Sequence, residues 1–138
     1  MTFVTDERHV LHALGDLLDG LRHELDSADG LRASHHRVLA HVPADGTSVT
    51  ELAAAVGMTK QGIGQFVAQL SESGHLRTET DPSDRRAKVV RRTAKGAASV
   101  RRLTRRLDRL EEDWAARVGE RRYATFRRVL DELSRPPA

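Results

Sequence analysis

A basic hairpin in the second half of this sequence carries the side chains best suited to binding a polyanion. Residues 81–96, D-P-S-D-R-R-A-K-V-V-R-R-T-A-K-G, place a turn between two short extended runs and bring Arg85, Arg86 and Lys88 near its tip. Pro82 presets a turn dihedral, and the neighbouring Asp and Ser side chains favour turns by bonding to the backbone. Such a basic wing suits nucleic-acid phosphates, although a solvated hairpin would share the pattern.

The segment before the wing has the start and stop signals of a helix-turn-helix. Residues 48–51, S-V-T-E, fit a capping box, in which Ser48 accepts from the Glu51 N–H and Glu51 reaches back. Gly57 can adopt the left-handed conformation that ends a helix, and Thr59 can cap the next helix after a short turn. This next helix, over 60–73, would bury the stripe Ile63, Phe66, Val67 and Leu70.

The opposite face of helix 60–73 is mostly polar and suits the major groove of DNA. Its members are Lys60, Gln61, Gly64, Gln65, Ala68 and Gln69. Because Lys and Gln can read guanine and adenine edges, we expect Lys60, Gln61 and Gln65 to contact bases. Thr59 and the N–H groups of the first turn would bind a phosphate, and Ser48 is a further expected DNA contact. Polar residues opposite an apolar stripe can equally face water. The interpretation that this face binds DNA therefore depends on the neighbouring turn and wing.

Charge is segregated along the chain. The formal net charge is +3, but residues 1–47 carry −4 and residues 48–138 carry +7. Between Arg77 and Arg106 there are eleven Lys or Arg residues against three acids, which predicts attraction to polyphosphate. For the cluster Arg101, Arg102, Arg105 and Arg106 alone, a solvated helix face is the preferred interpretation.

Composition predicts one mainly α-helical domain over residues 1–138. Aromatic residues are few, and Ala, Leu, Arg and Glu dominate the periodic stretches. The absence of cysteine excludes disulfides and thiolate metal sites. No apolar run approaches the roughly 18 residues of a membrane span, and the polar start MTFVTDERHV does not resemble a signal peptide. We therefore expect a cytoplasmic protein without membrane contact.

Amphipathic helices flank the predicted DNA-binding segment. One is expected over 6–27 and a short one over 34–42, with Ser34 as its N-cap. Two more are expected within 94–134, ending before Pro136. Their apolar stripes are Val10, Leu14, Leu17, Leu21 and Leu25 in the first helix, and Val100, Leu103, Leu107, Leu110 and Trp114, then Phe126, Val129, Leu130 and Leu133, in the last two. Packing within one chain must cover part of this surface, and a second chain could cover the rest.

These motifs resemble the MarR family of winged helix-turn-helix transcriptional regulators. The resemblance covers roughly residues 31–100 and rests on L-A-A-A-V-G-M, the helix start T-K-Q, the following S-G, and above all D-x-R-A-x-x-V followed by T-x-x-G. Two departures stand out. Arg92 precedes Thr93 where the family usually has Leu, and glycines at 62 and 64 replace side chains in the recognition helix. We infer that the recognition helix approaches the groove closely and that relatively more of the discrimination between DNA sequences comes from the wing and from DNA shape.

The resemblance implies a fold, partners and a mode of action. It implies a winged lobe over about 31–93, with dimerisation helices over 6–27 and 94–134. The chain would be a homodimeric repressor on a near-palindromic double-stranded operator, with Arg86 in the minor groove and Asp84 holding the wing. A small aromatic or phenolic effector, and no other cofactor, would release the DNA, and His12, His35 and His36 could line its pocket.

Other classes of function fit the sequence less well. No glycine-rich phosphate loop, HExxH motif or serine elbow is present, and Asp16, Asp19, Asp108 and Glu111 look like solvated acids, so we expect no enzyme. A winged helix that binds only proteins is the main rival, and it predicts a dispensable wing. A metal-responsive regulator is a further alternative, but zinc needs three or four converging ligands and the C-terminal helices contain no His or Cys.

Overall fold

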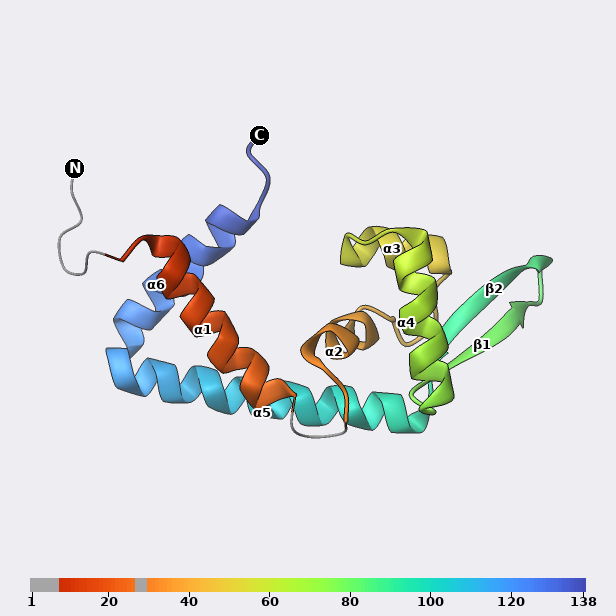
Figure 1. Cartoon of the computed structure of the whole chain (residues 1–138), viewed down its shortest axis with the longest axis horizontal. Helices are drawn as coiled ribbons and strands as arrows, with labels where there is room; N and C mark the ends of the chain where they lie inside the picture. Colours follow the sequence, from red (N-terminus) through yellow and green to blue (C-terminus); the bar gives the residue numbers. More distant parts are fainter. Residues whose placement is uncertain (1–7, 27–29) are drawn as a thin grey trace. The chain divides into compact units, whose positions relative to one another are not determined.

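The chain is mainly helical with a small antiparallel sheet, as the sequence predicts. A computed structural model describes residues 8–26 and 30–138 (Figure 1). Its elements in order are α1 (Val10–Leu25), α2 (Ala33–Ala40), α3 (Val49–Val56), α4 (Lys60–Glu72), β1 (Leu76–Asp81), β2 (Asp84–Arg92), α5 (Ala94–Val118) and α6 (Glu120–Ser134). Residues 6, 7 and 27 of the predicted first helix lie outside the described part. The chain forms two compact units, divided after Val100.

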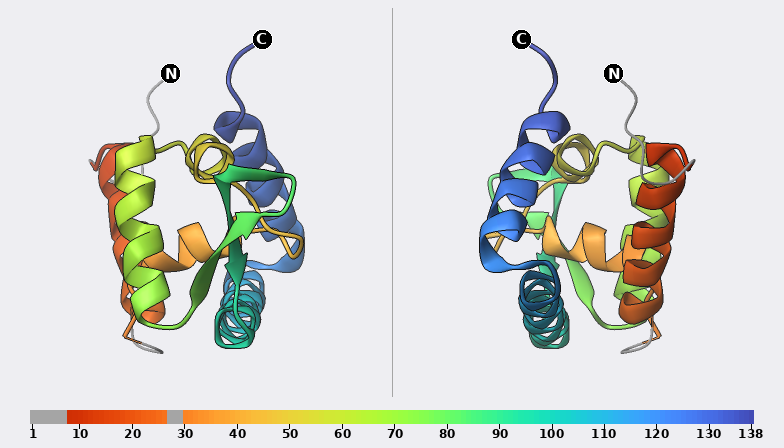
Figure 2. Two further views of the ribbon diagram at one scale, coloured as in Figure 1. Left: turned by 90° about the vertical axis from the view of Figure 1, so that its right-hand side faces the viewer. Right: turned by 90° about the vertical axis from the view of Figure 1, so that its left-hand side faces the viewer.

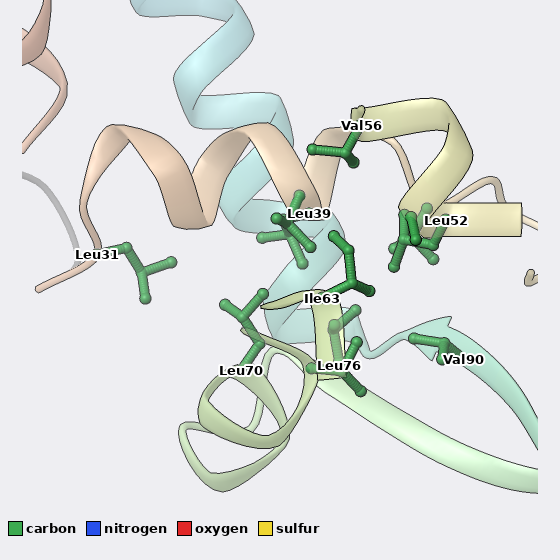
Figure 3. Packing of buried hydrophobic residues seen from close by; sticks show 12 residues of the cluster. Leu31, Leu39, Leu52, Val56, Ile63, Leu70, Leu76 and Val90 are labelled. Carbon is green, nitrogen blue, oxygen red and sulfur yellow. The ribbon is translucent and has the colours of Figure 1, made fainter. Parts of the chain in front are cut away.

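The core of the first unit lies among α2, α3, α4 and the base of the sheet. Twelve apolar side chains are at most 7% exposed, and they all fall between Leu31 and Val90. Figure 3 shows Leu39, Ile63 and Leu76 converging from different elements. Most of these positions form the apolar stripes of α2, α3 and α4, so burying them together turns the polar faces of these helices outwards. No described helix is long and apolar enough to span a membrane.

The sheet is a two-stranded hairpin that the loop before α3 extends. β1 and β2 pair from Leu76↔Arg92 to Thr80↔Lys88, with an irregularity before Asp81↔Asp84 at the tip. Thr47 forms an isolated bridge with Val90, with N–H···O distances of 3.0 and 2.7 Å. The wing is therefore tied at its base and extends freely at its tip.

The start of α2 differs from the sequence prediction. The helix begins at Ala33, so Ser34 is not its N-cap. Instead, Asp26 Oδ1 accepts from the Ala33 N–H at 3.0 Å, and His35 Nδ1 accepts from the Arg32 N–H at 3.2 Å. A carboxylate seven positions upstream satisfies the donor that a local cap would have satisfied.

In the second unit, α6 turns away from the axis of α5 after Gly119, whose φ is +94° (Figures 1 and 2). The Tyr123 hydroxyl donates to Glu111, and Arg127 pairs with the same carboxylate at 3.4 Å. Burial, then the hydrogen bond to Glu111, raises the pKa of Tyr123 to about 12. Glu111 is therefore a half-buried link between two helices, and the prediction that it is a solvated acid was wrong.

Candidate nucleic-acid interface

The helix-turn-helix is assembled by local backbone capping, as predicted. Ser48 Oγ accepts from the Glu51 N–H at 3.1 Å, and Gly57 ends α3 with φ +76° and ψ +35°. Thr59 Oγ1 then accepts from the Gly62 N–H at 3.1 Å and begins α4. The hydroxyls of Ser48 and Thr59 thus cap the N-termini of α3 and α4.

The two faces of α4 are those expected from its sequence. Ile63, Val67 and Leu70 are buried, and Phe66 is half-buried. The face predicted to meet DNA is exposed throughout, and it comprises Lys60, Gln61, Gly64, Gln65, Ala68 and Gln69. This polar face is therefore held outwards by the core beneath it.

Two aspartates shape the tip of the wing. Asp81 accepts from the Ser83 N–H at 2.9 Å and from its hydroxyl at 2.7 Å, and these hydrogen bonds hold the pKa of Asp81 below its usual value. Asp84 Oδ1 accepts from the Arg86 N–H at 3.0 Å. Because both acids bond the backbone of the turn, the exposed side chains of Arg85 and Arg86 start from a defined position.

Arg91 forms a clamp at the base of the wing that was not predicted from the sequence. Arg91 Nε donates to Glu79 at 3.0 Å, while its Nη1 donates to the Asp45 carbonyl at 2.7 Å. Arg77 pairs with the other oxygen of Glu79 at 2.9 Å. Gly46 permits this arrangement, because a Cβ there would lie 2.6 Å from Val89 Cγ1. Arg91 and Asp45 are 46 positions apart, so no local sequence pattern could have revealed this contact.

The T-x-x-G motif joins α5 to the end of α4. Thr93 Oγ1 donates to the Gly74 carbonyl at 2.5 Å and accepts from the Gly96 N–H at 3.1 Å. A Cβ at Gly96 would lie 2.0 Å from the His75 carbonyl oxygen, so this close approach requires glycine. The neighbouring Arg92 is half-buried and pairs with Leu76 in the register of the sheet.

Among the long polar side chains of the first unit, two groups bear on DNA binding. One group has partners within the chain: Arg37 donates to the Val56 carbonyl at 2.9 Å, Lys95 to the Ser73 carbonyl at 2.8 Å, and Arg77, Arg91 and Gln69 are likewise engaged. In the other group, no side chain makes a hydrogen bond or ion pair with any residue of the described chain. Its members are Lys60, Gln61, Gln65, Arg85, Arg86 and Lys88. We call these six the uncommitted set, and all six were predicted to contact DNA.

The histidines predicted to line a ligand pocket lie in different surroundings. His12 is exposed on α1, and His35 on α2 bonds Gln69 at 2.9 Å. His36 is buried in the first unit with 2% of its surface exposed. Within residues 8–26 and 30–138, no three His, Asp or Glu side chains are grouped as a metal ion would require.

Comparison with known proteins identifies the family. A family model described as the MarR family matches residues 29–87. A putative transcriptional regulatory protein for the hcr operon of Thauera aromatica is 30% identical over 99 residues, which cover 72% of this chain and 58% of that protein. The HTH-type transcriptional regulator PetP of Rhodobacter capsulatus is 32% identical over 114 residues, covering 81% of this chain and 68% of the relative.

Solved structures share the fold over nearly the whole chain. The PcaV transcriptional regulator from Streptomyces coelicolor, in complex with its natural ligand, matches with TM-score 0.74 and 23% identity, covering 97% of each chain. A MepR–DNA complex of S. aureus matches with TM-score 0.77 and 16% identity, covering 92% of this chain and 96% of that one. The chain therefore belongs to the MarR family, whose members are transcriptional regulators and not enzymes.

Proposed function

We propose that this regulator binds a specific double-stranded DNA operator in the cytoplasm and represses transcription there. The proposal rests on the location of the uncommitted set. Its members lie on the exposed face of α4 and on the wing, whereas Arg37, Arg77 and Lys95 of the same lobe have partners within the chain. In this mode, Lys60, Gln61 and Gln65 enter the major groove and Arg86 enters the minor groove. The DNA complex of the similarly folded MepR supports DNA binding by this fold.

A homodimer is the proposed binding form. On α1, the side chains of Val10, Leu11, Leu14, Leu17 and Leu18 are 38–68% exposed, and on α6 Phe126, Val129 and Leu133 are 36–78% exposed. Apolar stripes of this kind favour association with a second copy. A twofold dimer presents its two recognition helices about 34 Å apart, so the operator would be a near-palindrome.

Release by a small aromatic or phenolic ligand is the proposed regulatory step. The complex of PcaV with its natural ligand supports ligand binding by a protein of the same fold. The ligand would favour a form of the dimer in which the two lobes no longer match the operator spacing. His12 remains a candidate to bond a carboxylate or hydroxyl. His35 would do so only by releasing Gln69, and His36 is buried on α2. Adding aromatic acids to a preformed complex and following DNA release by fluorescence anisotropy tests this step.

The DNA proposal is tested by the salt dependence of binding. Each phosphate contact contributes about −0.9 to the slope of log affinity against log salt concentration. We expect Arg86→Ala to weaken binding across many sequences and to make this slope shallower by about 1. Arg77→Ala is the matched control, because Arg77 is an exposed wing arginine whose guanidinium pairs with Glu79 at 2.9 Å. Fluorescence anisotropy with labelled duplex at several salt concentrations measures both variants.

Two results would contradict the proposal. The first is an absence of duplex binding at low salt by the wild-type protein, which would favour a protein-binding winged helix. The second is an equal loss of affinity in Arg86→Ala and Arg77→Ala, because the uncommitted arginine would then have no special role. The paired variants thus test the distinction between engaged and uncommitted side chains directly.

A further inference from the structure

Three glutamines recur every four residues along the exposed face of α4, but their side chains are not equivalent. Gln61, Gln65 and Gln69 are all exposed. Gln61 and Gln65 belong to the uncommitted set. Gln69 is bound by His35 of α2, whose Nε2 lies 2.9 Å from Gln69 Oε1. His35 also packs edge-on against Phe66, with ring centroids 5.3 Å apart.

The hydrogen bonds of His35 determine its tautomer and the orientation of the Gln69 amide. His35 Nδ1 accepts from the Arg32 N–H at 3.2 Å, so Nδ1 carries no proton. In a neutral imidazole, Nε2 must then be the donor. Its partner on Gln69 must be the carbonyl oxygen, which turns this amide towards α2. Gln69 therefore cannot present both its oxygen and its NH₂ group to a base edge.

The residues that neighbour Gln61 and Gln65 on this face of α4 have little or no side chain. Gly64 lies beside them, and a Cβ at this position would meet no atom within 4 Å. Ala68 continues the same exposed face with only a methyl group. A base pair can therefore approach the helix backbone closely, and the two uncommitted amides are the groups it would meet first.

We propose that Gln61 and Gln65 each read an adenine, and that His35 keeps Gln69 out of this readout. The proposal rests on the DNA-binding function proposed above and assigns its sequence preference. A glutamine amide matches adenine bidentately, with its oxygen accepting from N6–H₂ and its NH₂ donating to N7. The thymine methyl of the same base pair is apolar, and Gly64 and Ala68 leave it room.

Helix geometry gives the spacing of the two adenines. Residues four apart on a helix are about 6 Å apart along its axis. Successive base pairs rise about 3.4 Å along one DNA strand, so the two amides reach positions about two base pairs apart. Each half-site would thus contain A·T pairs about two steps apart, facing the first two turns of α4.

Removal of single atoms from the DNA tests the readout. Half-sites selected from random duplex by the wild-type chain should contain these adenines. Replacing either adenine with 7-deazaadenine removes N7 and should weaken binding about five- to hundredfold. The same replacement should cost less than about twofold in the variant that lacks the matching amide, Gln61→Ala or Gln65→Ala. Competition binding with labelled duplex measures each combination.

Gln69→Ala is the matched control, because it removes the same exposed amide from the same helix. We expect it to leave the selected half-site and the penalty of 7-deazaadenine unchanged. Selected half-sites without adenine, or an unchanged penalty in both Gln61→Ala and Gln65→Ala, would overturn the assignment while leaving DNA binding intact. Altered preference in Gln69→Ala would overturn the role given to His35. Absence of any duplex binding would instead contradict the proposed function itself.

Discussion

The winged lobe and the C-terminal unit use apolar residues in opposite ways. In the lobe, every apolar core residue from Leu31 to Val90 is at most 7% exposed. None of residues 101–138 is buried, and α1 has no buried residue in its described range. The lobe therefore completes its core within one chain, whereas the terminal helices leave apolar surface exposed, which the proposed dimer would cover. Burial of such a side chain stabilises by about 1.5 to 3 kcal/mol, which favours association once a second copy is present.

The largest expected effect is the difference between two leucine variants, one in the lobe and one in α6. Leu39 is fully buried and Leu133 is 78% exposed. Leu39→Ala should lower the free energy of unfolding by about 2 to 5 kcal/mol at any protein concentration. Leu133→Ala should leave the fold of one chain nearly unchanged and weaken the dimer. Denaturant unfolding and sedimentation at several protein concentrations measure the two effects.

The contrast between the two regions would be contradicted if Leu39→Ala and Leu133→Ala changed the free energy of unfolding in the same way. An equal, concentration-independent loss of stability in Leu133→Ala would mean that its own chain covers this side chain. Sedimentation of the wild-type protein as a stable monomer at micromolar concentration would contradict the dimer.

A second pair of variants sharpens the comparison within the lobe. Gly96→Ala places a Cβ 2.0 Å from the His75 carbonyl oxygen, so we expect a loss of about 1 to 3 kcal/mol. Gly64→Ala adds the same methyl to α4 in open space and should stabilise the helix by about 0.5 to 1 kcal/mol. Thermal unfolding compares them, and a stabilising Gly96→Ala would show that α5 does not pack closely against the wing base.

The smallest effect concerns the polar link of the C-terminal unit. Tyr123→Phe removes the hydrogen bond to Glu111 and should cost about 1 kcal/mol. Because the pKa of Tyr123 rises from 10.0 to about 12 in the folded chain, this contribution is complete below pH 10. It is then lost as the pH rises through 12. Wild-type and variant stabilities measured between pH 8 and pH 12 should therefore converge, and parallel curves would contradict the link.

Several parts of the site could be predicted because their signals are local. The capping box at Ser48, the left-handed Gly57 and the Thr59 cap each depend on residues within a few positions. The predicted faces of α4 follow from helical periodicity alone, and the exposed Lys60, Gln61 and Gln65 agree with it. The turn at Asp81 likewise forms through its own neighbours.

Other features escaped prediction because their hydrogen bonds do not follow the usual capping and turn rules. The N–H groups of Arg32 and Ala33 bond His35 and Asp26, so the rule that selected Ser34 as the N-cap of α2 did not apply. Arg91 appeared in the sequence as one more positive charge of the wing. Its bonds to Glu79 and to the Asp45 carbonyl make it part of the scaffold. Residue type alone therefore overestimates the charge available to a ligand.

The sequence by itself determined the family, the order of the elements and the capped helix-turn-helix with its basic wing, because caps, turns and apolar periodicity act over short distances. Only the tertiary structure decided which of several similar side chains remain available. Gln65 and Gln69 share a residue type, a helix and a face, yet among the described residues only Gln69 has a partner, His35, 34 positions away. This difference depends on how α2 packs against α4, and helical spacing carries no information about that packing.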